Sequence, residues 1–172
     1  MKRLLKKVAK LQHPYSTPDG EINKEKREAK KFGIELMNEN VKGNILDIGG
    51  EEFYHKDSTN ITSYNLPNDM HLLDEVEQYE GIISMHTLEH SPVPLLVIEN
   101  IYRALKKGGY FYVAVPKPSD FFEVGFPDHL TMMSAHMWKK LLEIAGFEIV
   151  HRSSAKFNPN DDWIENRFLC KK

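Results

Sequence analysis

The sequence predicts an α/β domain with a mostly parallel sheet that is covered by helices on both faces. Three observations support this. Short, mostly apolar runs alternate with amphipathic segments of helical periodicity, and the apolar residues within most runs are consecutive. Continuous apolar runs are typical of strands buried on both faces. The length of 172 residues and the hydrophobic content of 41% suit one core and not two.

Two helical segments are expected before the first strand, within residues 1–20 and from Glu21 to about Asn40. Residues 1–20 form a basic helical segment and a linker, and the domain proper is expected over residues 21–172. The basic segment could dock on its own domain or lie on an anionic membrane surface, and docking is the simpler interpretation. An amphipathic helix is expected from Glu21 to about Asn40, with Asp19 placed to cap it.

Six strands and two further helices follow. The strands are expected at residues 45–48, 61–64, 82–85, 110–115, 147–150 and 167–170. One helix is predicted to start at a Ser91 cap with Pro92 in its first turn, and to end at Lys106-Lys107-Gly108. A second helix is predicted from Ser134 to Gly146.

Composition excludes several functional classes. Lys and Arg number 23 against 25 Asp and Glu, so the formal net charge of -2 does not favour a nucleic-acid partner. Cys170 is the single cysteine, which rules out a disulfide framework and fits a reducing compartment. No apolar stretch is long enough to span a membrane, and the basic start Met1-Lys2-Arg3 is not followed by the apolar region and cleavage site typical of a signal peptide, so we expect none. We therefore expect a cytoplasmic protein without integral membrane association.

The turn after the first strand carries the strongest functional signal. Ligands of open α/β sheets bind at the carboxyl ends of the strands, where Asp47, Gly49 and Gly50 stand here. Glycines allow a ligand close to the backbone, but the acidity of the turn would repel a pyrophosphate. A cationic ligand suits this turn better than a dinucleotide.

Several segments in order resemble the class I S-adenosylmethionine-dependent methyltransferases. Ile45 to Gly50 is similar to their first motif, and Ile82 to His90 is similar to their fourth strand and its following loop. Ile101 to Tyr110 resembles the helix, the basic Gly-Gly turn and the fifth strand that follow in the family. The segments 129–131 and 141–150 resemble the penultimate segment of the same subfamily's sequences. The resemblance implies a Rossmann-like fold and S-adenosyl-L-methionine as the cofactor.

The sequence departs from the family pattern in two places. Glu51 and Phe53 stand where the family usually has its later glycines. In addition, the intervals from Asp47 to Asn65 and from Asn65 to Ile82 are shorter than the family needs for its usual elements. We therefore expect missing or shortened elements between the first strand and the strand that resembles the family's fourth.

The resemblance also implies a set of cofactor-binding residues. Asn65 matches the position of the acid that binds the ribose hydroxyls, and Asp69 with Met70 matches the pair that meets the adenine. Asp69 could equally be an exposed turn residue, and Met85 could equally be a core residue. The full expected set is Asp47, Gly49, Gly50, Asn65, Asp69, Met70, Met85 and His86.

Methyl transfer from a sulfonium is an in-line displacement, which needs at most one base. His86, His90 and His129 are the candidate bases because histidine titrates near neutral pH and all three should reach the carboxyl edge. Each could instead be a packing residue, and Glu89 could orient one of them. No metal site is expected, because the nearby acids and histidine (Glu51, Glu52, His55 and Asp57) lack a recognisable ligand spacing.

The function expected from the sequence is methyl transfer to a small molecule such as a sugar, a lipid or another metabolite. The alternative is a degenerate, non-catalytic relative that serves as a binding or interaction module, which the altered glycine turn and Asn65 favour. Loss of covering elements would also expose apolar surface that a homodimer could bury.

Overall fold

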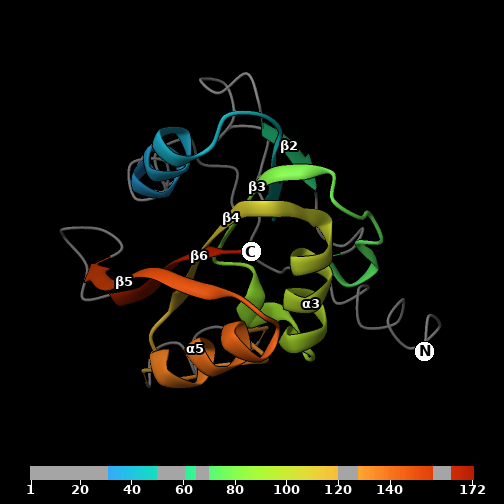
Figure 1. The fold of residues 1–172 in the computed structure, drawn as a ribbon. Helices are drawn as coiled ribbons and strands as arrows, with labels where there is room; N and C mark the ends of the chain where they lie inside the picture. The colour runs from blue at the N-terminus through green and yellow to red at the C-terminus, as the bar shows by residue number, and fades with distance from the viewer. Residues whose placement is uncertain (1–30, 50–60, 65–69, 120–127, 157–163) are drawn as a thin grey trace, which may run out of the picture.

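In the computed structural model the chain forms a single six-stranded sheet, within the part of the chain that the structure describes (Figure 1). The described residues are 31–49, 61–64, 70–119, 128–156 and 164–172. The strand order is β2-β1-β3-β4-β6-β5. The strands are β1 (Ile45–Ile48), β2 (Ile61–Tyr64), β3 (Tyr79–Met85), β4 (Leu105–Pro116), β5 (Glu148–Lys156) and β6 (Ile164–Lys171).

The sheet is parallel at one end and antiparallel at the other. β1 pairs in parallel with β2 and β3, and β3 pairs in parallel with β4. β6 runs antiparallel between β4 and β5. The predicted mostly parallel α/β fold is therefore confirmed. β1, β3 and β4 run in the same direction, so their carboxyl ends lie together along the same side of the sheet, at the ends of the strands.

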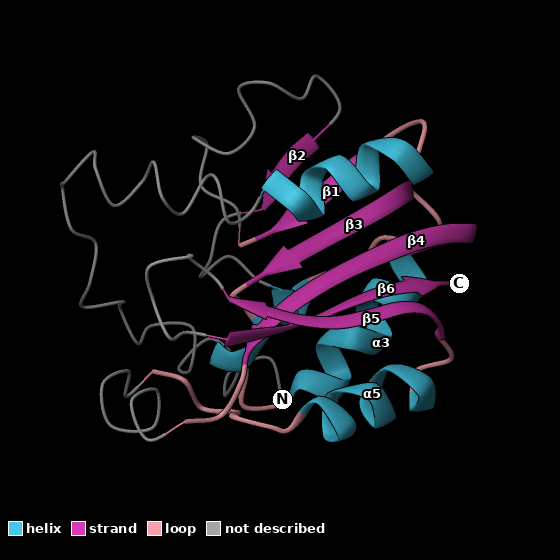
Figure 2. Ribbon diagram, turned by 90° about the vertical axis from the view of Figure 1, so that its left-hand side faces the viewer, coloured by secondary structure: helices cyan, strands magenta, loops and turns pink. Residues whose placement is uncertain are grey.

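Helices cover both faces of the sheet (Figure 2). The helix that includes residues 31–40 lies on one face, while α3 (Pro94–Ala104) and α5 (Ala135–Ile144) lie on the other. Each face has its own apolar core. The core under α3 and α5 is the larger and includes Trp138, and the core under residues 31–40 is built around Met37.

α3 begins later and ends earlier than the sequence suggested. Val93 is the residue before its first turn and Pro94 occupies the first turn, where a missing N–H costs nothing. Ser91 does not cap α3; its hydroxyl oxygen accepts a hydrogen bond from the Val93 N–H. At the other end β4 starts at Leu105, so the predicted helix end at Lys106-Lys107-Gly108 is wrong and these residues belong to the strand.

α5 matches the prediction closely. The Ser134 hydroxyl oxygen accepts a hydrogen bond from the Met137 N–H, which satisfies a donor of the first turn. Trp138 and Leu142, one turn apart, are both buried against the sheet.

The connection from β2 to β3 is short. Its described part, residues 70–78, contains one 3-10 turn, η2 (Met70–Leu72), and no α-helix. This agrees with the predicted shortening between the first strand and β3. Residues 50–60 of the first interval, which include Glu51 and Phe53, lie outside the described residues, as does the N-terminal segment 1–20. No described helix is both long and apolar enough to cross a membrane.

Candidate active site

The carboxyl ends of β1 and β3 meet at the edge where the sequence places the site. Asp47 stands in the centre of this parallel region, paired in register with Ser63 of β2 and Ile83 of β3. It is buried, with 2% of its surface exposed. A carboxylate at this place gives the edge negative charge, which suits a ligand with sulfonium and ammonium groups and no phosphate.

Gly49 and Thr87 interlock just beyond these strand ends. Gly49 has a φ of 81°, and a Cβ added there would lie 2.1 Å from the Thr87 hydroxyl oxygen. The Thr87 hydroxyl in turn lies 3.2 Å from the carbonyl oxygens of Ile48 and Met85, to which it can donate. The space freed by the missing side chain of Gly49 is thus filled by Thr87, so this glycine joins the ends of β1 and β3.

His86 leaves β3 with a strained backbone. Its φ of 52° lies in the left-handed region, which is uncommon outside glycine. Its N–H donates to the Ala114 carbonyl of β4 at 2.9 Å, which holds this conformation. The side chain is 20% exposed, and its Nε2 lies 2.6 Å from the Glu165 Oε2.

Glu165 of β6 is a site residue that the sequence analysis missed. It is buried, and the Arg167 Nε donates to its second carboxylate oxygen. Burial alone would raise the pKa of this carboxyl, but the hydrogen bond and charge of His86, together with Arg167, hold the pKa below its ordinary value. In the sequence Glu165 is followed by Asn166 and Arg167 and lies before the predicted strand at 167–170, so no motif or apolar run marked it.

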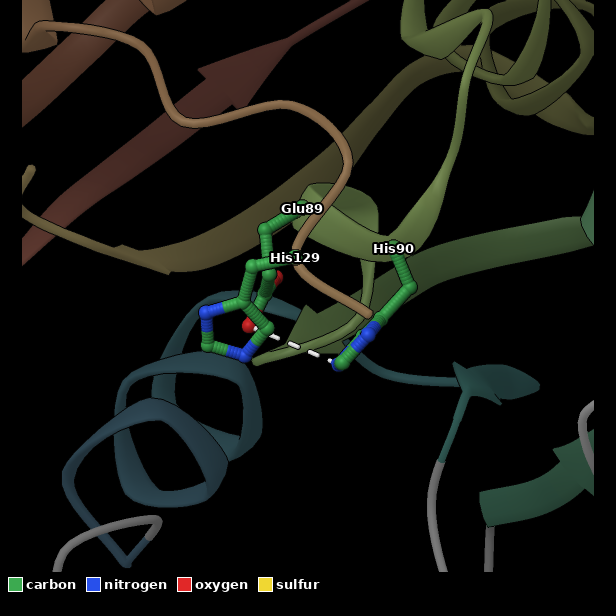
Figure 3. A group of neighbouring side chains, drawn as sticks. All are labelled: Glu89, His90 and His129. Carbon is green, nitrogen blue, oxygen red and sulfur yellow. Dashed lines mark ion pairs between the residues drawn. The ribbon is translucent and has the colours of Figure 1, made fainter. Parts of the chain in front are cut away.

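Beside His86 lies a second cluster, formed by Glu89, His90 and His129 (Figure 3). Glu89 and His90 come from the 3-10 turn η3 (Leu88–His90), and His129 comes from the loop before α5. The rings of His90 and His129 pack edge to face with centroids 4.8 Å apart. The Glu89 Oε1 lies 3.7 Å from the His86 Nδ1 and 3.9 Å from the His90 Nε2. The structure therefore brings the three predicted histidines together around one carboxylate.

The other predicted cofactor residues divide into two groups. Met70 is buried in the core with α3, and Met85 is buried in the core under residues 31–40. The position of Met85 suits its core interpretation, and Met70 is a core residue as well. A contact of either residue with the cofactor stays a prediction. Gly50, Asn65 and Asp69 lie outside the described residues.

A cavity of about 630 Å³ opens beside the ends of β4, β5 and β6. Its volume lies in the range of small-molecule sites. Its lining mixes apolar, polar and basic residues, and consists of Lys117, Pro118, Ser134, Ala135, Arg152, Ser154, Ala155, Lys156, Ile164 and Asn166.

Comparison with protein families gives one match, over most of the chain. The profile of a family described as methyltransferase domain matches residues 21–152. A search of curated proteins finds no match.

Solved structures show the same fold at low sequence identity. A chain of the complex between the Haloferax volcanii Trm112 methyltransferase activator and a protein assigned as a methyltransferase is 15% identical, with a TM-score of 0.68, over 89% of this chain and 94% of that one. A protein assigned as a sarcosine dimethylglycine methyltransferase from Galdieria sulphuraria is 14% identical, with a TM-score of 0.64, over 85% of each chain. The trans-methyltransferase CalH, solved with S-adenosylhomocysteine, is 17% identical, with a TM-score of 0.64, over 90% of this chain and 60% of that one.

Proposed function

The chain belongs to the methyltransferase domain family and is an S-adenosylmethionine-dependent methyltransferase, and from this premise we propose that it methylates a hydroxyl of a small molecule, with His86 as the general base. The observation that carries the proposal is the 2.6 Å contact between the His86 Nε2 and the buried Glu165 carboxylate. The cofactor, when bound, supplies a methyl group on a sulfonium.

The pairing with Glu165 defines which nitrogen of His86 would act. A carboxylate that is ionised can only accept, so Nε2 carries the proton of this hydrogen bond. The lone pair is then on Nδ1, which would accept the proton of the acceptor hydroxyl. Glu89, 3.7 Å from Nδ1, would stabilise the imidazolium that forms. Glu165 is a positioning residue in this scheme, because it fixes the ring and its tautomer.

Asp47 is the proposed principal cofactor residue among the described ones. It is the acid at the centre of the parallel strands, and its charge complements the cationic groups of S-adenosylmethionine. Gly49 supports the proposed cofactor site indirectly, because its packing against Thr87 holds the carboxyl ends of β1 and β3 together.

A small molecule is the proposed acceptor class. The cavity at the ends of β4, β5 and β6 has the size for one, and its Lys117 and Arg152 would favour an anionic group there. Its lining shares no residue with the His86–Glu165 pair. Sugars, lipids and other metabolites include compounds with an anionic group. The formal net charge of -2 does not favour a nucleic-acid acceptor.

Two binding measurements test the cofactor part. Titration calorimetry with S-adenosylhomocysteine should show one binding site in the full chain, strongly weakened by Asp47→Asn. Asp74→Asn, at an exposed position, is the matched control and should bind as the wild type does. Absence of binding in the wild type at millimolar ligand would overturn the enzyme proposal and support the non-catalytic alternative.

Transfer of a labelled methyl group tests the acceptor and the base. The label should enter the small-molecule fraction of a cell extract, and label confined to macromolecules would overturn the acceptor class. His86→Asn should lower kcat by about 100-fold or more, the usual contribution of a general base. Glu165→Gln should lower kcat with little change in KM, and Glu165→Asp should restore part of it. Full activity of His86→Asn would refute the base assignment.

A further inference from the structure

We propose that Glu89, His90 and His129 form a binding site for one divalent transition-metal ion, with Zn²⁺ as the expected ion. Each residue offers one ligand atom, and these atoms lie within 4.8 Å of one another (Figure 3). One carboxylate oxygen and two imidazole nitrogens are a donor set that zinc accepts. No metal site was expected from the sequence, because the acids around His55 lack a ligand spacing. Glu89 and His90 are far from His129 in the chain, so no local motif joins these three residues.

The first support is the environment of Glu89. Its side chain is 1% exposed, and neither carboxylate oxygen accepts a hydrogen bond from a described residue. The His86 Nδ1 and the His90 Nε2 lie 3.7 and 3.9 Å from its Oε1, too far for hydrogen bonds. An ionised carboxylate in such a place is costly unless a cation lies beside it. A metal ion would supply that charge.

The second support is the orientation of His90. Its Nδ1 lies 3.1 Å from the main-chain carbonyl oxygen of Asp128 and 3.3 Å from a side-chain oxygen of the same residue. A carbonyl oxygen can only accept, so Nδ1 carries the proton and Nε2 carries the lone pair. That lone pair is on the nitrogen nearer Glu89. Metal-binding histidines commonly have their second nitrogen held by a carbonyl or carboxylate in this way.

The third support is that the two halves of the site are tied together. The loop that contains His129 is bonded to η3 by Thr131, whose N–H donates to the Glu89 carbonyl at 2.8 Å. The Thr131 hydroxyl lies 2.6 Å from the Ser91 carbonyl, to which it donates. Ligands 39 residues apart in the chain are thus held beside each other before any ion binds, which reduces the ordering cost of binding.

Binding of the metal ion requires only a small approach of the three ligand side chains. Zinc–ligand bonds of about 2.0 to 2.2 Å in a tetrahedron place ligand atoms about 3.4 Å apart, so the most distant pair would approach by roughly 1.4 Å. Side-chain rotation can provide this. Three protein ligands leave a fourth position for water or for an oxygen of a bound small molecule.

Titration of the metal-free full chain with Zn²⁺ and with Co²⁺ tests the proposal. We expect one equivalent of Zn²⁺ to bind and to raise Tm, since a ligand that binds only the folded state stabilises it. Co²⁺ should give visible absorption bands of a low-coordination site. Glu89→Gln, His90→Asn and His129→Asn should each weaken binding by about 10-fold or more. His136→Asn, an exposed histidine of α5, is the matched control and should not change it.

Three results would overturn the assignment. The first is no Zn²⁺ binding at millimolar concentration, and the second is binding that His129→Asn leaves unchanged while circular dichroism shows a native fold. The third is binding that His55→Ala abolishes, which would place the ion on the other acidic segment. The assignment does not depend on the proposed methyl acceptor, because these measurements contain neither cofactor nor acceptor.

Discussion

The hydroxyl oxygen of Thr87 lies 2.1 Å from the place where a Cβ on Gly49 would be. The Thr87 side chain can therefore keep its position only if residue 49 is a glycine. The contact joins the end of β1 to the residue that follows His86. It therefore links the stability of the domain to the geometry of the proposed site.

Gly49→Ala should destabilise the protein more than Gly108→Ala does. Both glycines have a positive φ, 81° and 79°, and an alanine there costs about 1–2 kcal/mol. Nothing lies within 4 Å of a Cβ at Gly108, whereas one at Gly49 collides with Thr87. Overpacking adds about 1–3 kcal/mol to the free energy lost. Urea unfolding of the two variants measures the difference, and an equal loss would contradict the interlock.

The Glu165 carboxyl predicts how stability depends on pH. Its pKa in the folded protein is below the ordinary value of 4.5, so folding favours the ionised form. The stabilisation is fully present above about pH 4.5 and is lost as pH falls through the folded pKa. The groups that face it are His86, Arg167 and the Tyr112 hydroxyl.

Glu165→Gln should therefore be less stable than the wild type at pH 6, and the difference should shrink as the pH falls below 4.5. Urea midpoints measured at several pH values give this comparison. Glu148→Gln, at an exposed position of β5, is the control and should follow the wild type throughout. A constant gap between Glu165→Gln and wild type across this pH range would contradict the assignment.

Cys170 provides a probe of the sheet. It is fully buried in β6, opposite Phe111 of β4, and burial raises the pKa of its thiol. Alkylation by iodoacetamide should be slower in the native protein than in urea by about 100-fold or more. Because the chain has one cysteine, mass spectrometry reads this rate without ambiguity. Rapid and complete labelling under native conditions would show that β6 is not held between β4 and β5.

The local patterns in the sequence predicted most of the fold, because apolar runs and caps act over a few residues. Ser134 caps α5 as expected, and the strand Ile45–Ile48 lies in the middle of the parallel region. The end of α3 was misjudged because Lys106 and Gly108 are typical of helix ends. In the structure Lys106 instead pairs with Glu80 of β3, and β4 extends back to Leu105.

The sequence indicated most residues of the candidate site, but not how residues distant in the chain meet. His86, Glu89 and His90 belong to one segment, and the sequence indicated all three. Glu165 lies 79 positions after His86, and the two meet because β6 runs antiparallel to β4 with Glu165 opposite Pro116. No periodicity in the sequence fixes that register. The approach of His129 to Glu89 likewise depends on the hydrogen bonds of Thr131.

The left-handed backbone conformation of His86 lowers the stability of the fold, although the side chain is proposed to serve catalysis. A glycine at this position would adopt the same φ without strain and remove a cost of about 1 kcal/mol, but it would also remove the imidazole. Selection for heat tolerance alone would thus favour losing this ring, while selection for turnover would retain it. The proposed base is kept at a thermodynamic cost that the rest of the fold must compensate.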